Sequence, residues 1–492
     1  SAVLEGVGLI VADPRDIELS EIADVHLQQR PGSDVALVNA MMNVIIEENL
    51  ADENFIAQRT ENFEAAAAVI RECTPERASE ITGVPAEDIV RAARLYASAD
   101  RGSIYFAMGI TQHHTGTDNV LSLANLAMLS GNVGREGTGV NPLRGQNNVQ
   151  GACDMGALPN VLPGYQAVGD DELRRRFEEK WGTALPEDPG LTVVEMMQAA
   201  GDQIRAMYIM GENPMVSDPD QKHVEEALEK LDFLLVQDIF LTETAQYADV
   251  VLPAVSFAEK EGTFTNTERR IQRVRSAVSP PDSARQDWQI ICELAEKMGY
   301  DMSNSHPAEV MREIASLTPI YGGISYDRIE DRGLQWPCPH ADHPGTPYLH
   351  RDQFSRGLGR FHPVEYIPPA ETPDAEYDFV LMTGRMLYHF HTGTMTRRSQ
   401  AIDRHEPDGY VEMNLDDCER LGISEGDRVR ITSRRGSVQT FVRAGRRVLP
   451  GHLFMPFHYA ESAANRLTGT ALDPVAKIPE LKVSAVKVER AS

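Results

Sequence analysis

Apolar runs of strand length, each ending at an acidic residue or a glycine, recur through the first half of this sequence. The runs are Leu9–Ala12 before Asp13, Ser103–Met108 before Gly109, Ile204–Met210 before Gly211, and Phe233–Gln237 before Asp238. Stretches with helical patterns separate them, so the sequence predicts an α/β fold with parallel strands. Ligands of such folds bind outside the carboxyl ends of the strands, where these acids and glycines lie. The sequence has no GxGxxG motif, which argues against a free dinucleotide such as NAD.

The spacing of the strands changes towards the C-terminus. Short strands are predicted at Phe379–Met382, Tyr410–Met413, Arg428–Ile431 and Val438–Val442. Such close spacing is typical of a barrel, here one of six strands. Because 492 residues are too many for one core, we expect two Rossmann-like α/β domains, 1–146 and 147–351, followed by a β-barrel at 352–492. A stretch rich in proline, histidine and glycine, from Gly333 to Gly359, is expected to be an irregular connection.

The composition argues against several partners. The formal net charge of −27 disfavours a nucleic acid or an anionic membrane as a partner. No apolar run reaches the length of a membrane-spanning helix. The five cysteines are widely scattered and form no CxxC pair, which argues against a disulfide framework, a zinc site or an iron–sulfur cluster within these residues. Cys338, in the sequence WPCPH, is therefore interpreted as an isolated loop cysteine.

The segment Leu143–Gly156, with the sequence LRGQNNVQGACDMG, has neither helical nor strand periodicity. Its glycines let the backbone approach a ligand closely, and its carboxamides offer both donors and acceptors to a large polar cofactor. Arg144 carries a forked set of donors that matches a carboxylate or a phosphate. A polar surface loop is the alternative interpretation of this segment.

This motif resembles the signature of molybdopterin-dependent formate dehydrogenase alpha subunits, a branch of the dimethyl sulfoxide reductase family, and the resemblance extends through essentially the whole chain. It implies interconversion of formate and CO2 on a bis(molybdopterin guanine dinucleotide) cofactor that holds molybdenum or tungsten. It also implies electron transfer through a 4Fe–4S cluster to an iron–sulfur, NAD(P)-linked or ferredoxin-linked subunit. The barrel is then expected to be the double-psi barrel that closes family members over the cofactor.

The resemblance also implies roles for individual residues. Arg144 is implied as the catalytic residue, which orients formate beside the metal. The implied cofactor contacts are Arg15, Gly32, Asp34, Met108, Gly109, Gln112, Gly145, Gln146, Gly211, Asn213, Asp238, Arg385, His389, Thr392, Asn465 and Lys482. The contacts to one guanosine match Arg15, Gly32 and Asp34, and those to the other match Gly211, Asn213 and Asp238, continued by Thr265–Arg270.

Some of these regions have competing interpretations. Ser33 or Asp34 could be the N-cap of the helix predicted at Val35–Glu48, in place of a guanine ligand at Asp34. His113 and His114 could indicate a metal site, but adjacent residues on an extended chain point in opposite directions, which argues against one. Three irregularly spaced histidines are expected in an exposed connection: His340, His343 and His350.

Ser1 is not an initiator residue, and an α/β fold normally places other strands before one such as Leu9–Ala12. We therefore expect the sequence to begin inside a domain. In the family, the upstream part carries the 4Fe–4S site and the cysteine or selenocysteine that binds the metal. No metal ligand is thus expected in these 492 residues, which alone are expected to be inactive. A cytoplasmic location is expected, with any export signal upstream of Ser1.

Two other functions remain open. Nitrate reduction, or another reaction of the same family, would use the same cofactor, although the segment 143–156 follows the formate branch. A non-catalytic scaffold, similar to the large subunit of respiratory complex I, would have the fold without the cofactor. Such a scaffold has no physical need to keep four residues together: Arg144, Gln146, Asp34 and Asp238.

Overall fold

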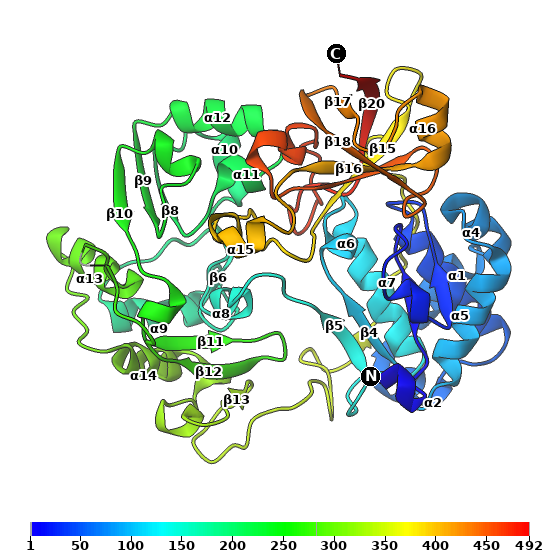
Figure 1. Cartoon of the computed structure of the whole chain (residues 1–492). Coiled ribbons are helices and arrows are strands. Elements are labelled where there is room, and N and C mark those ends of the chain that lie inside the picture. Colours follow the sequence, from blue (N-terminus) through cyan, green and yellow to red (C-terminus); the bar gives the residue numbers. More distant parts are fainter. Residues whose placement is uncertain (1, 282, 492) are drawn as a thin grey trace. The chain divides into compact units, whose positions relative to one another are not determined.

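The computed structural model describes residues 2–281 and 283–491. The chain folds into two compact units, each built from segments that are distant in the sequence (Figure 1). Unit 1 contains the described parts of Ser1–Pro142, Val216–Lys222 and Tyr348–Ser492, and unit 2 contains those of Leu143–Met215 and His223–Pro347. Because unit 1 includes both the first α/β region and the barrel, the division into three domains remains a prediction.

The α/β part of unit 1 is built around a buried helix, α1 (Asp34–Glu47). The helices that follow it are α2 (Glu53–Arg59), α3 (Phe63–Arg71), α4 (Pro75–Thr82), α5 (Ala86–Ser98), α6 (Met108–Thr111) and α7 (Gly116–Leu129). Apolar side chains predominate on every side of α1, so every residue from Asp34 to Ile45 is buried. The helix packs against α4, α5 and α7, and its Leu37 and Met41 belong to the core they share.

Short parallel strands accompany these helices. β1 (Ile10–Ala12) pairs with β2 (Val25–Leu27), β4 (Ser103–Phe106) with β5 (Gly139–Pro142), and β3 (Thr60–Glu61) with β14 (Gly359–Arg360). All three pairs are parallel, so the α/β class is confirmed. Among the described residues, these strands form separate two-stranded sheets and not one continuous sheet.

The C-terminal part of unit 1 is a closed six-stranded barrel, as predicted (Figure 1, yellow to red). In pairing order its strands are β15 (Phe379–Gly384), β19 (His452–Pro456), β16 (Tyr410–Asn414), β18 (Ser437–Gly445), β17 (Arg428–Thr432) and β20 (Ser484–Arg490). The pairs β15–β19 and β16–β18 are parallel. Buried and exposed residues alternate along β17 and β18, so one side of each strand fills the barrel. Two short helices join the strands: α15 (Gln400–Asp403) and α16 (Leu415–Leu421).

The described part of unit 2 contains a parallel and an antiparallel three-stranded sheet and one two-stranded hairpin. The parallel sheet has the order β10 (Val250–Pro253), β9 (Phe233–Asp238), β8 (Ala206–Met210). The antiparallel sheet has the order β11 (Gly262–Thr265), β12 (Arg270–Val274), β13 (Leu334–Gln335). β6 (Val161–Leu162) and β7 (Gln166–Ala167) form a hairpin. The helices of this part of the chain are α8 (Val149–Asp154), α9 (Asp171–Trp181), α10 (Val193–Gln198), α11 (Pro214–Ser217), α12 (Gln221–Glu229), α13 (Asp287–Lys297) and α14 (Pro307–Leu317).

Several predicted boundaries differ from those of the structure. The strand predicted at Ser103–Met108 ends at Phe106, and Met108 begins α6. The apolar run at Ser103–Met108 is typical of a buried strand, and this expectation is wrong, since Tyr105 is 66% exposed. The prediction for β9 is confirmed: the strand ends at Asp238, and the residues 234–238 are all buried.

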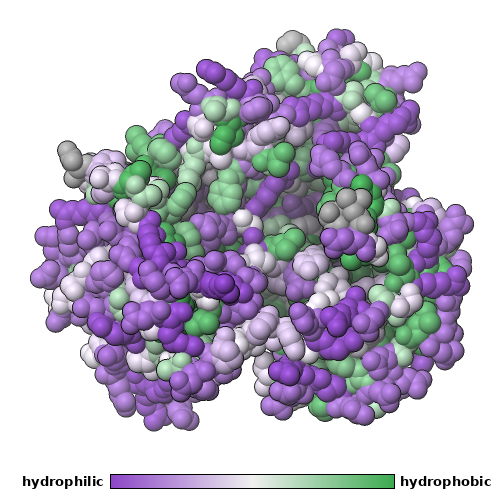
Figure 2. All heavy atoms as spheres, turned by 60° about the horizontal axis from the view of Figure 1, so that its bottom comes forward, coloured by the Kyte–Doolittle hydropathy of each residue, from purple (hydrophilic) through white to green (hydrophobic). Residues whose placement is uncertain are grey.

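The surface and the thiols agree with the composition. Hydrophilic residues predominate on the face shown in Figure 2, where apolar residues form scattered groups. No helix in the described part of the chain is both long and apolar enough to cross a membrane. All five cysteines are free thiols, and Cys338 lies in a loop as predicted but is buried in a core with Ile271 and Tyr321.

Candidate functional site

The segment Leu143–Gly156 lies in unit 2 and contains a short helix, α8, which its sequence does not predict. Asn148 precedes the helix with φ of 60°, and its Oδ1 accepts a hydrogen bond from the Thr265 backbone N–H at 2.9 Å. A Cβ added to Gly151 would lie 2.1 Å from this Oδ1, so only glycine fits there. The turn is thus built by its own residues and anchored to β11, and a plain polar loop does not describe it.

Arg144 is exposed at the start of this segment and is held at one nitrogen only. Its Nε–H donates to Oε1 of Gln150 at 3.1 Å. Among the described residues, none accepts a hydrogen bond from either terminal nitrogen of its guanidinium. A planar pair of donors left open in this way matches the two oxygens of a carboxylate. Gly145 beside it is exposed, and Gln146 is half-buried.

The strand-end residues of unit 2 divide into two kinds. Gly211 follows β8 with φ of 65°, and no atom lies within 4 Å of the place where a Cβ would be, so its backbone is open to a ligand. Asn213 is buried, and its amide is used within the chain: Nδ2 donates to Glu243 at 2.7 Å, and Oδ1 accepts from the Thr244 hydroxyl at 2.7 Å. Asp238 is also buried, and its Oδ1 accepts from the backbone N–H two residues further on at 3.1 Å.

The segment Thr265–Arg270, which joins β11 to β12, is connected to the same part of unit 2. The Thr265 hydroxyl lies 3.0 Å from the Tyr321 hydroxyl, and the backbone of Thr265 binds Asn148. Arg269 donates to the backbone carbonyl of Trp336, and its guanidinium lies 5.3 Å from that indole ring. The structure thus brings this segment against the segment 143–156, two regions to which the resemblance assigns cofactor contacts.

In unit 1, Asp34 lies in a buried polar cluster. Gln29 Nε2 donates to Asp34 Oδ1 at 3.2 Å, and His113 Nε2 lies 3.9 Å from Oδ2. Burial raises the pKa of the Asp34 carboxyl, an effect that His113 and Gln29 only partly offset. Of the two N-cap interpretations, the one for Ser33 is confirmed by position, although its hydroxyl donates to the Arg30 carbonyl and does not cap the helix. Asp34 is the first residue of α1 and not its cap. Gln29 Oε1 and His113 Nδ1 are buried without a hydrogen-bond partner in the described residues, which suits a polar ligand.

His113 and His114 face the same carboxylate, contrary to the expectation that they point in opposite directions. The Nδ1 atoms of His114 and His113 lie 3.0 Å and 3.8 Å from Glu480 Oε1. The chain turns here between α6 and α7 and is not extended, which is why the expectation was wrong. Burial raises the pKa of Glu480, but the two histidines outweigh this effect and hold the pKa below its usual value. No group of three or more His, Cys, Asp or Glu side chains in the described part of the chain could hold a metal ion.

Two predicted nucleotide contacts have structural roles within unit 1. The Arg15 guanidinium binds both carboxylate oxygens of Glu412, at 2.9 Å and 2.7 Å, and lies 3.6 Å from the centre of the Phe454 ring. A Cβ on Gly32 would approach Pro369 Cγ to 2.6 Å, and φ of 77° also favours glycine. These contacts explain both residue types without a ligand, and their assignment to guanosine remains a prediction.

The start of α6, where the resemblance implies cofactor contacts, is accessible. Met108 begins the helix, and its sulfur accepts a hydrogen bond from the Thr111 hydroxyl at 3.5 Å. Gly109 is exposed, with no atom within 4 Å of where a Cβ would lie. The Gln112 carbonyl accepts from the Leu481 N–H at 3.1 Å, which joins this helix to the segment that leads into β20.

Two cations lie near each other at the end of β15, and few groups of the protein compensate their charges. Lys482 Nζ donates to the Thr383 carbonyl at 2.7 Å. Burial, together with the Arg385 charge, lowers the pKa of Lys482 to about 8, and the Asp13 charge only partly opposes the shift. Arg385 is half-buried, and no residue in the described part of the chain accepts a hydrogen bond from it; the Phe457 ring lies 5.9 Å away. We call Arg385 and Lys482 the cation pair.

Two histidines that sequence reasoning missed adjoin this pair. Burial, together with the Arg385 charge, lowers the pKa of His391 and of His458 to about 4 in each case. Both rings are therefore neutral near pH 7. His458 accepts from the Met386 N–H at 3.2 Å and is hydrogen-bonded to the His391 carbonyl. The one available signal was the density of histidines beside the predicted contact His389.

Two other predicted cofactor contacts in the barrel, His389 and Thr392, form hydrogen bonds within the chain. His389 is buried, with its ring nitrogens 3.2 Å from the Thr396 hydroxyl and 2.8 Å from the Glu406 carbonyl, so both are used internally. The Thr392 hydroxyl lies 2.9 Å from that of Thr394. These side chains therefore shape the loop after β15.

Asn465 presents an unused acceptor. Its Nδ2 donates to the backbone carbonyls of Val216 and Ser217, both at 2.9 Å. Its Oδ1 is buried without a hydrogen-bond partner in the described residues. Such an orphaned acceptor suits a ligand that carries N–H or O–H donors.

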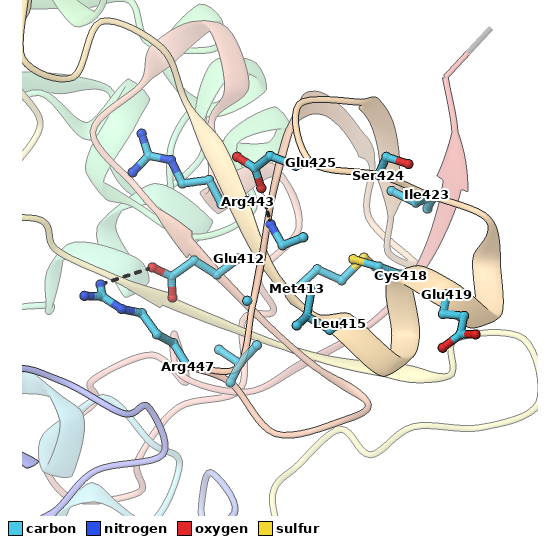
Figure 3. Close-up of a pocket in the computed structure, with 13 residues that line it drawn as sticks. Glu412, Met413, Leu415, Cys418, Glu419, Ile423, Ser424, Glu425, Arg443 and Arg447 are labelled. Atoms are coloured by element: carbon cyan, nitrogen blue, oxygen red, sulfur yellow. Dashed lines mark hydrogen bonds and ion pairs between the residues drawn. The ribbon is translucent and has the colours of Figure 1, made fainter.

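A hollow of about 800 Å³ opens on the barrel beside α16 (Figure 3). Glu412 lies on its wall and is bound by Arg15, with Arg447 Nη1 3.9 Å away. Glu425, across the hollow, accepts from the Ala444 N–H at 2.6 Å. None of the predicted site residues lines this hollow, and two of its acidic side chains, Glu412 and Glu425, have partners within the chain. It is therefore not the candidate site.

Comparison with known protein families shows to which family the chain belongs. A family model described as "Molybdopterin oxidoreductase" matches residues 2–297, and one described as "Molydopterin dinucleotide binding domain" matches residues 379–485. The chain belongs to the molybdopterin oxidoreductase family. The second match spans the cation pair and Asn465, and the first spans the segment 143–156.

The relatives of this family member include formate dehydrogenase alpha subunits. The chain is 54% identical over 490 residues to the F420-dependent formate dehydrogenase subunit alpha of Methanocaldococcus jannaschii, covering 99% of the chain and 72% of that protein. It is 43% identical over 499 residues to formate dehydrogenase H of Escherichia coli, covering 99% of the chain and 70% of that protein. The expected resemblance to formate dehydrogenase alpha subunits is confirmed.

A solved structure shows the same fold. Acetylene hydratase from Pelobacter acetylenicus superposes with a TM-score of 0.77, covering 100% of the chain and 75% of that protein at 20% sequence identity. The expected architecture, α/β with a six-stranded barrel, is thus confirmed for the family member.

The residues present fit a molybdopterin cofactor. Its phosphate groups are anionic, and the cation pair has no acceptor within the described chain for Arg385 and only the Thr383 carbonyl for Lys482. Its pterin and nucleotide rings carry N–H donors, which the orphaned Oδ1 of Asn465 can accept. A cation with no partner inside the protein is unfavourable unless an anion binds there. These features support a molybdopterin cofactor bound by this chain.

Proposed function

We propose that this chain belongs to the catalytic subunit of a molybdopterin-dependent formate dehydrogenase, which oxidises formate to CO2 with release of one proton and two electrons. The observation that carries the proposal is the open guanidinium fork of Arg144 within the formate-type motif LRGQNNVQGACDMG. The names of the relatives from M. jannaschii and E. coli, both formate dehydrogenases, support the same substrate.

In this proposal Arg144 binds the formate carboxylate through two parallel hydrogen bonds and neutralises its charge. A carboxylate held in this way has its C–H bond directed away from the guanidinium, so the residue orients the substrate as well as binding it. The bound molybdopterin cofactor supplies the two-electron acceptor. The cation pair of unit 1 binds an anionic part of that cofactor, and Gly109 and Gly211 let the backbone come close to it.

The cofactor is further proposed to be the bis(guanine dinucleotide) form with molybdenum or tungsten. Acidic residues after or near parallel strands in both units, Asp34 and Asp238, support two nucleotide arms, since a carboxylate can accept both N–H groups of a guanine. Electrons would pass through a 4Fe–4S cluster to a partner subunit. The F420-dependent relative adds an F420-linked subunit to the iron–sulfur, NAD(P)-linked and ferredoxin-linked partners already considered. A cytoplasmic location remains a prediction.

A comparison of formate and nitrate tests the function. We expect the full-length protein, purified without oxygen, to reduce a viologen dye with formate and to oxidise the reduced dye slowly or not at all with nitrate. Faster turnover of nitrate than of formate would assign the chain to the nitrate-reducing branch. Protein that carries no molybdenum, tungsten or pterin and turns over neither anion would support the scaffold alternative.

The pKa of Lys482 leads to a prediction for the cofactor-free protein. The folded pKa of about 8 lies below the usual value of 10.5, so between these pH values the unfolded chain binds more protons than the folded chain. The free energy of unfolding should therefore rise as the pH increases from about 8 towards 10.5, because the penalty for burying the ammonium disappears. Urea unfolding across this range should show the rise in the parent protein and a smaller one in Lys482→Met. Equal pH dependence in both proteins would contradict the assignment of the shift to Lys482.

A further inference from the structure

Asp154, the last residue of α8, is a fully buried carboxylate that is bound only by neutral donors. Its Oδ1 accepts from Gln150 Nε2 and from the Tyr165 hydroxyl, both at 2.8 Å. Its Oδ2 accepts from the Tyr321 hydroxyl at 2.6 Å and from Trp336 Nε1 at 2.8 Å. Among the described residues, no Lys, Arg or His forms an ion pair with it. A buried charge without an ion pair requires such a full set of hydrogen bonds.

This carboxylate fixes the orientation of the Gln150 amide. Gln150 Nε2 donates to Asp154 Oδ1 and to the Tyr165 hydroxyl, both at 2.8 Å. An ionised carboxylate can only accept hydrogen bonds, so Gln150 must present its NH2 group to Asp154. The carbonyl oxygen of Gln150 is thereby left facing the Nε–H of Arg144. Asp154 thus determines that Arg144 meets an acceptor at Nε.

The contact at Nε determines which part of Arg144 remains available. Because the Nε–H of Arg144 donates to Gln150, only the two terminal nitrogens remain available to a ligand. The direction of the Gln150 carbonyl also sets the plane of the guanidinium. Formate bound end-on by this fork therefore has its direction set by Gln150. The chain of contacts runs from Asp154 to Gln150 to Arg144 and ends at the substrate.

The strained backbone of Tyr165 supports a specific role for its hydrogen bonds with Gln150 and Asp154. Tyr165 lies between β6 and β7 with φ of 60°, a conformation that bulky residues rarely adopt. Strained conformations of this kind persist where the surrounding contacts over-determine them. Here the phenol accepts from Gln150 and donates to Asp154, so the strained residue closes a ring of three hydrogen bonds.

We propose that Asp154 is a positioning residue for substrate binding: it orients the Gln150 amide, which in turn holds the Arg144 guanidinium in the geometry that receives formate. This inference rests on the proposed role of Arg144 in binding formate. It assigns a function to a fully buried acid whose two carboxylate oxygens accept hydrogen bonds from four donors of this chain.

The substitution Asp154→Asn reverses the orientation of Gln150 with little change of shape. The new amide has one NH2 group, which must face either Gln150 or the pair Tyr321 and Trp336. Trp336 can only donate and cannot adapt, whereas Gln150 can exchange its oxygen and nitrogen by rotating its amide. Gln150 should therefore turn its NH2 group towards Arg144 Nε–H, and these two donors repel each other. Arg144 then loses its orientation while its charge remains.

A second substitution restores the pattern of donors and acceptors. In the double variant Asp154→Asn/Gln150→Glu, the new carboxylate at position 150 accepts from both the amide at position 154 and the Nε–H of Arg144. Gln150→Glu alone should be harmful, since it places two carboxylates against each other where Nε2 now lies 2.8 Å from Oδ1. This set of variants separates orientation from simple burial of a charge.

We expect Asp154→Asn in the full-length holoenzyme to lower kcat/KM for formate by roughly 10- to 100-fold, the range typical for groups that orient a site residue. Metal content should be unchanged, and the rise in Tm that formate causes without an electron acceptor should be smaller. The double variant with Gln150→Glu should recover most of the loss. In an Arg144→Lys background, Asp154→Asn should change kcat/KM by no more than about threefold, because the two residues act through one path.

The outcomes distinguish this inference from the proposed function. If Arg144→Lys alone leaves kcat/KM for formate unchanged, the proposed role of Arg144 is wrong. If Arg144→Lys is impaired but Asp154→Asn costs the same factor in both backgrounds, Asp154 does not act through Arg144. Loss of metal or of folding in Asp154→Asn that Gln150→Glu does not repair would show a purely structural role.

Discussion

Replacing Arg144 with lysine in the full-length holoenzyme should lower kcat/KM for formate by roughly 30- to 900-fold, the equivalent of a 2–4 kcal/mol loss of transition-state stabilisation. Lysine keeps the positive charge but has no planar fork, so it cannot pair with both formate oxygens at once. It also cannot place a donor at the position of Nε while leaving two others free, so the contact with Gln150 competes with the substrate.

Formate kinetics and metal content should be measured on the same preparation of this variant. We expect full loading with molybdenum or tungsten, because Arg144 is exposed and its guanidinium donates a hydrogen bond only to Gln150 among the described residues. Arg175→Lys is a suitable control, since Arg175 is exposed on α9 and its Nε–H donates to the Asp171 carbonyl of the same helix. Normal kinetics in a fully loaded Arg144→Lys protein would remove Arg144 from the substrate site. Loss of the cofactor with normal kinetics in the loaded fraction would make it a brace for the loop.

The sequence predicted those elements whose patterns are local. The apolar run that forms β9 has one buried side chain after another and ends at an acid, so it could be placed to the residue. Alternation of exposed and buried residues likewise marks β17 and β18. The strands β19 and β20 were not placed by pattern, because their burial is nearly continuous and alternation is absent. The antiparallel sheet β11–β12–β13 was missed too, since β13 is two residues long and pairs across more than 60 intervening positions.

The sequence predicted the local motif of the candidate site but not the contacts that distant residues make with it. The motif LRGQNNVQGACDMG contains Arg144, Gln150 and Asp154 together, yet nothing in it distinguishes Gln150 and Asp154 from their neighbours. The donors that define Asp154 include Tyr321 and Trp336, which are separated from it by 167 and 182 positions. Such contacts depend on the packing of unit 2 and have no local signature.

The interpretation of His113 and His114 failed for a related reason. It assumed an extended backbone, whereas the residues lie in a turn between two helices and both approach Glu480. Residues predicted as contacts also proved unequal: Arg15 and His389 use their polar atoms within the chain, and Arg385 does not. A pattern identifies which residue types are present, but only the structure shows which of their donors and acceptors are still free.

Arg385 provides the second large effect, in which cofactor retention and stability should move in different directions. Arg385→Met removes a half-buried cation that lies near Lys482 and has no acceptor in the described chain. Burial already lowers the pKa of Arg385, which shows that the charged form is disfavoured where it lies. The cofactor-free variant should therefore be as stable as the parent protein or more stable in urea unfolding. Lost charge-assisted hydrogen bonds of about 1.5–3 kcal/mol should nonetheless weaken cofactor binding roughly 10- to 150-fold.

The contrast with another arginine of unit 1 makes this test specific. Arg434 is ion-paired with Glu371 and Asp374 near the surface of the barrel, so Arg434→Met removes a satisfied cation. That control should keep its molybdenum or tungsten and pterin content, and its stability should change little because solvent screens exposed ion pairs. For Arg385→Met, a lower free energy of unfolding together with full cofactor content would show that Arg385 stabilises the fold and does not bind the cofactor. The unpaired charge of Arg385 beside Lys482, whose pKa is lowered, is unfavourable in the cofactor-free protein. Binding of an anion between them explains why the protein has both cations there.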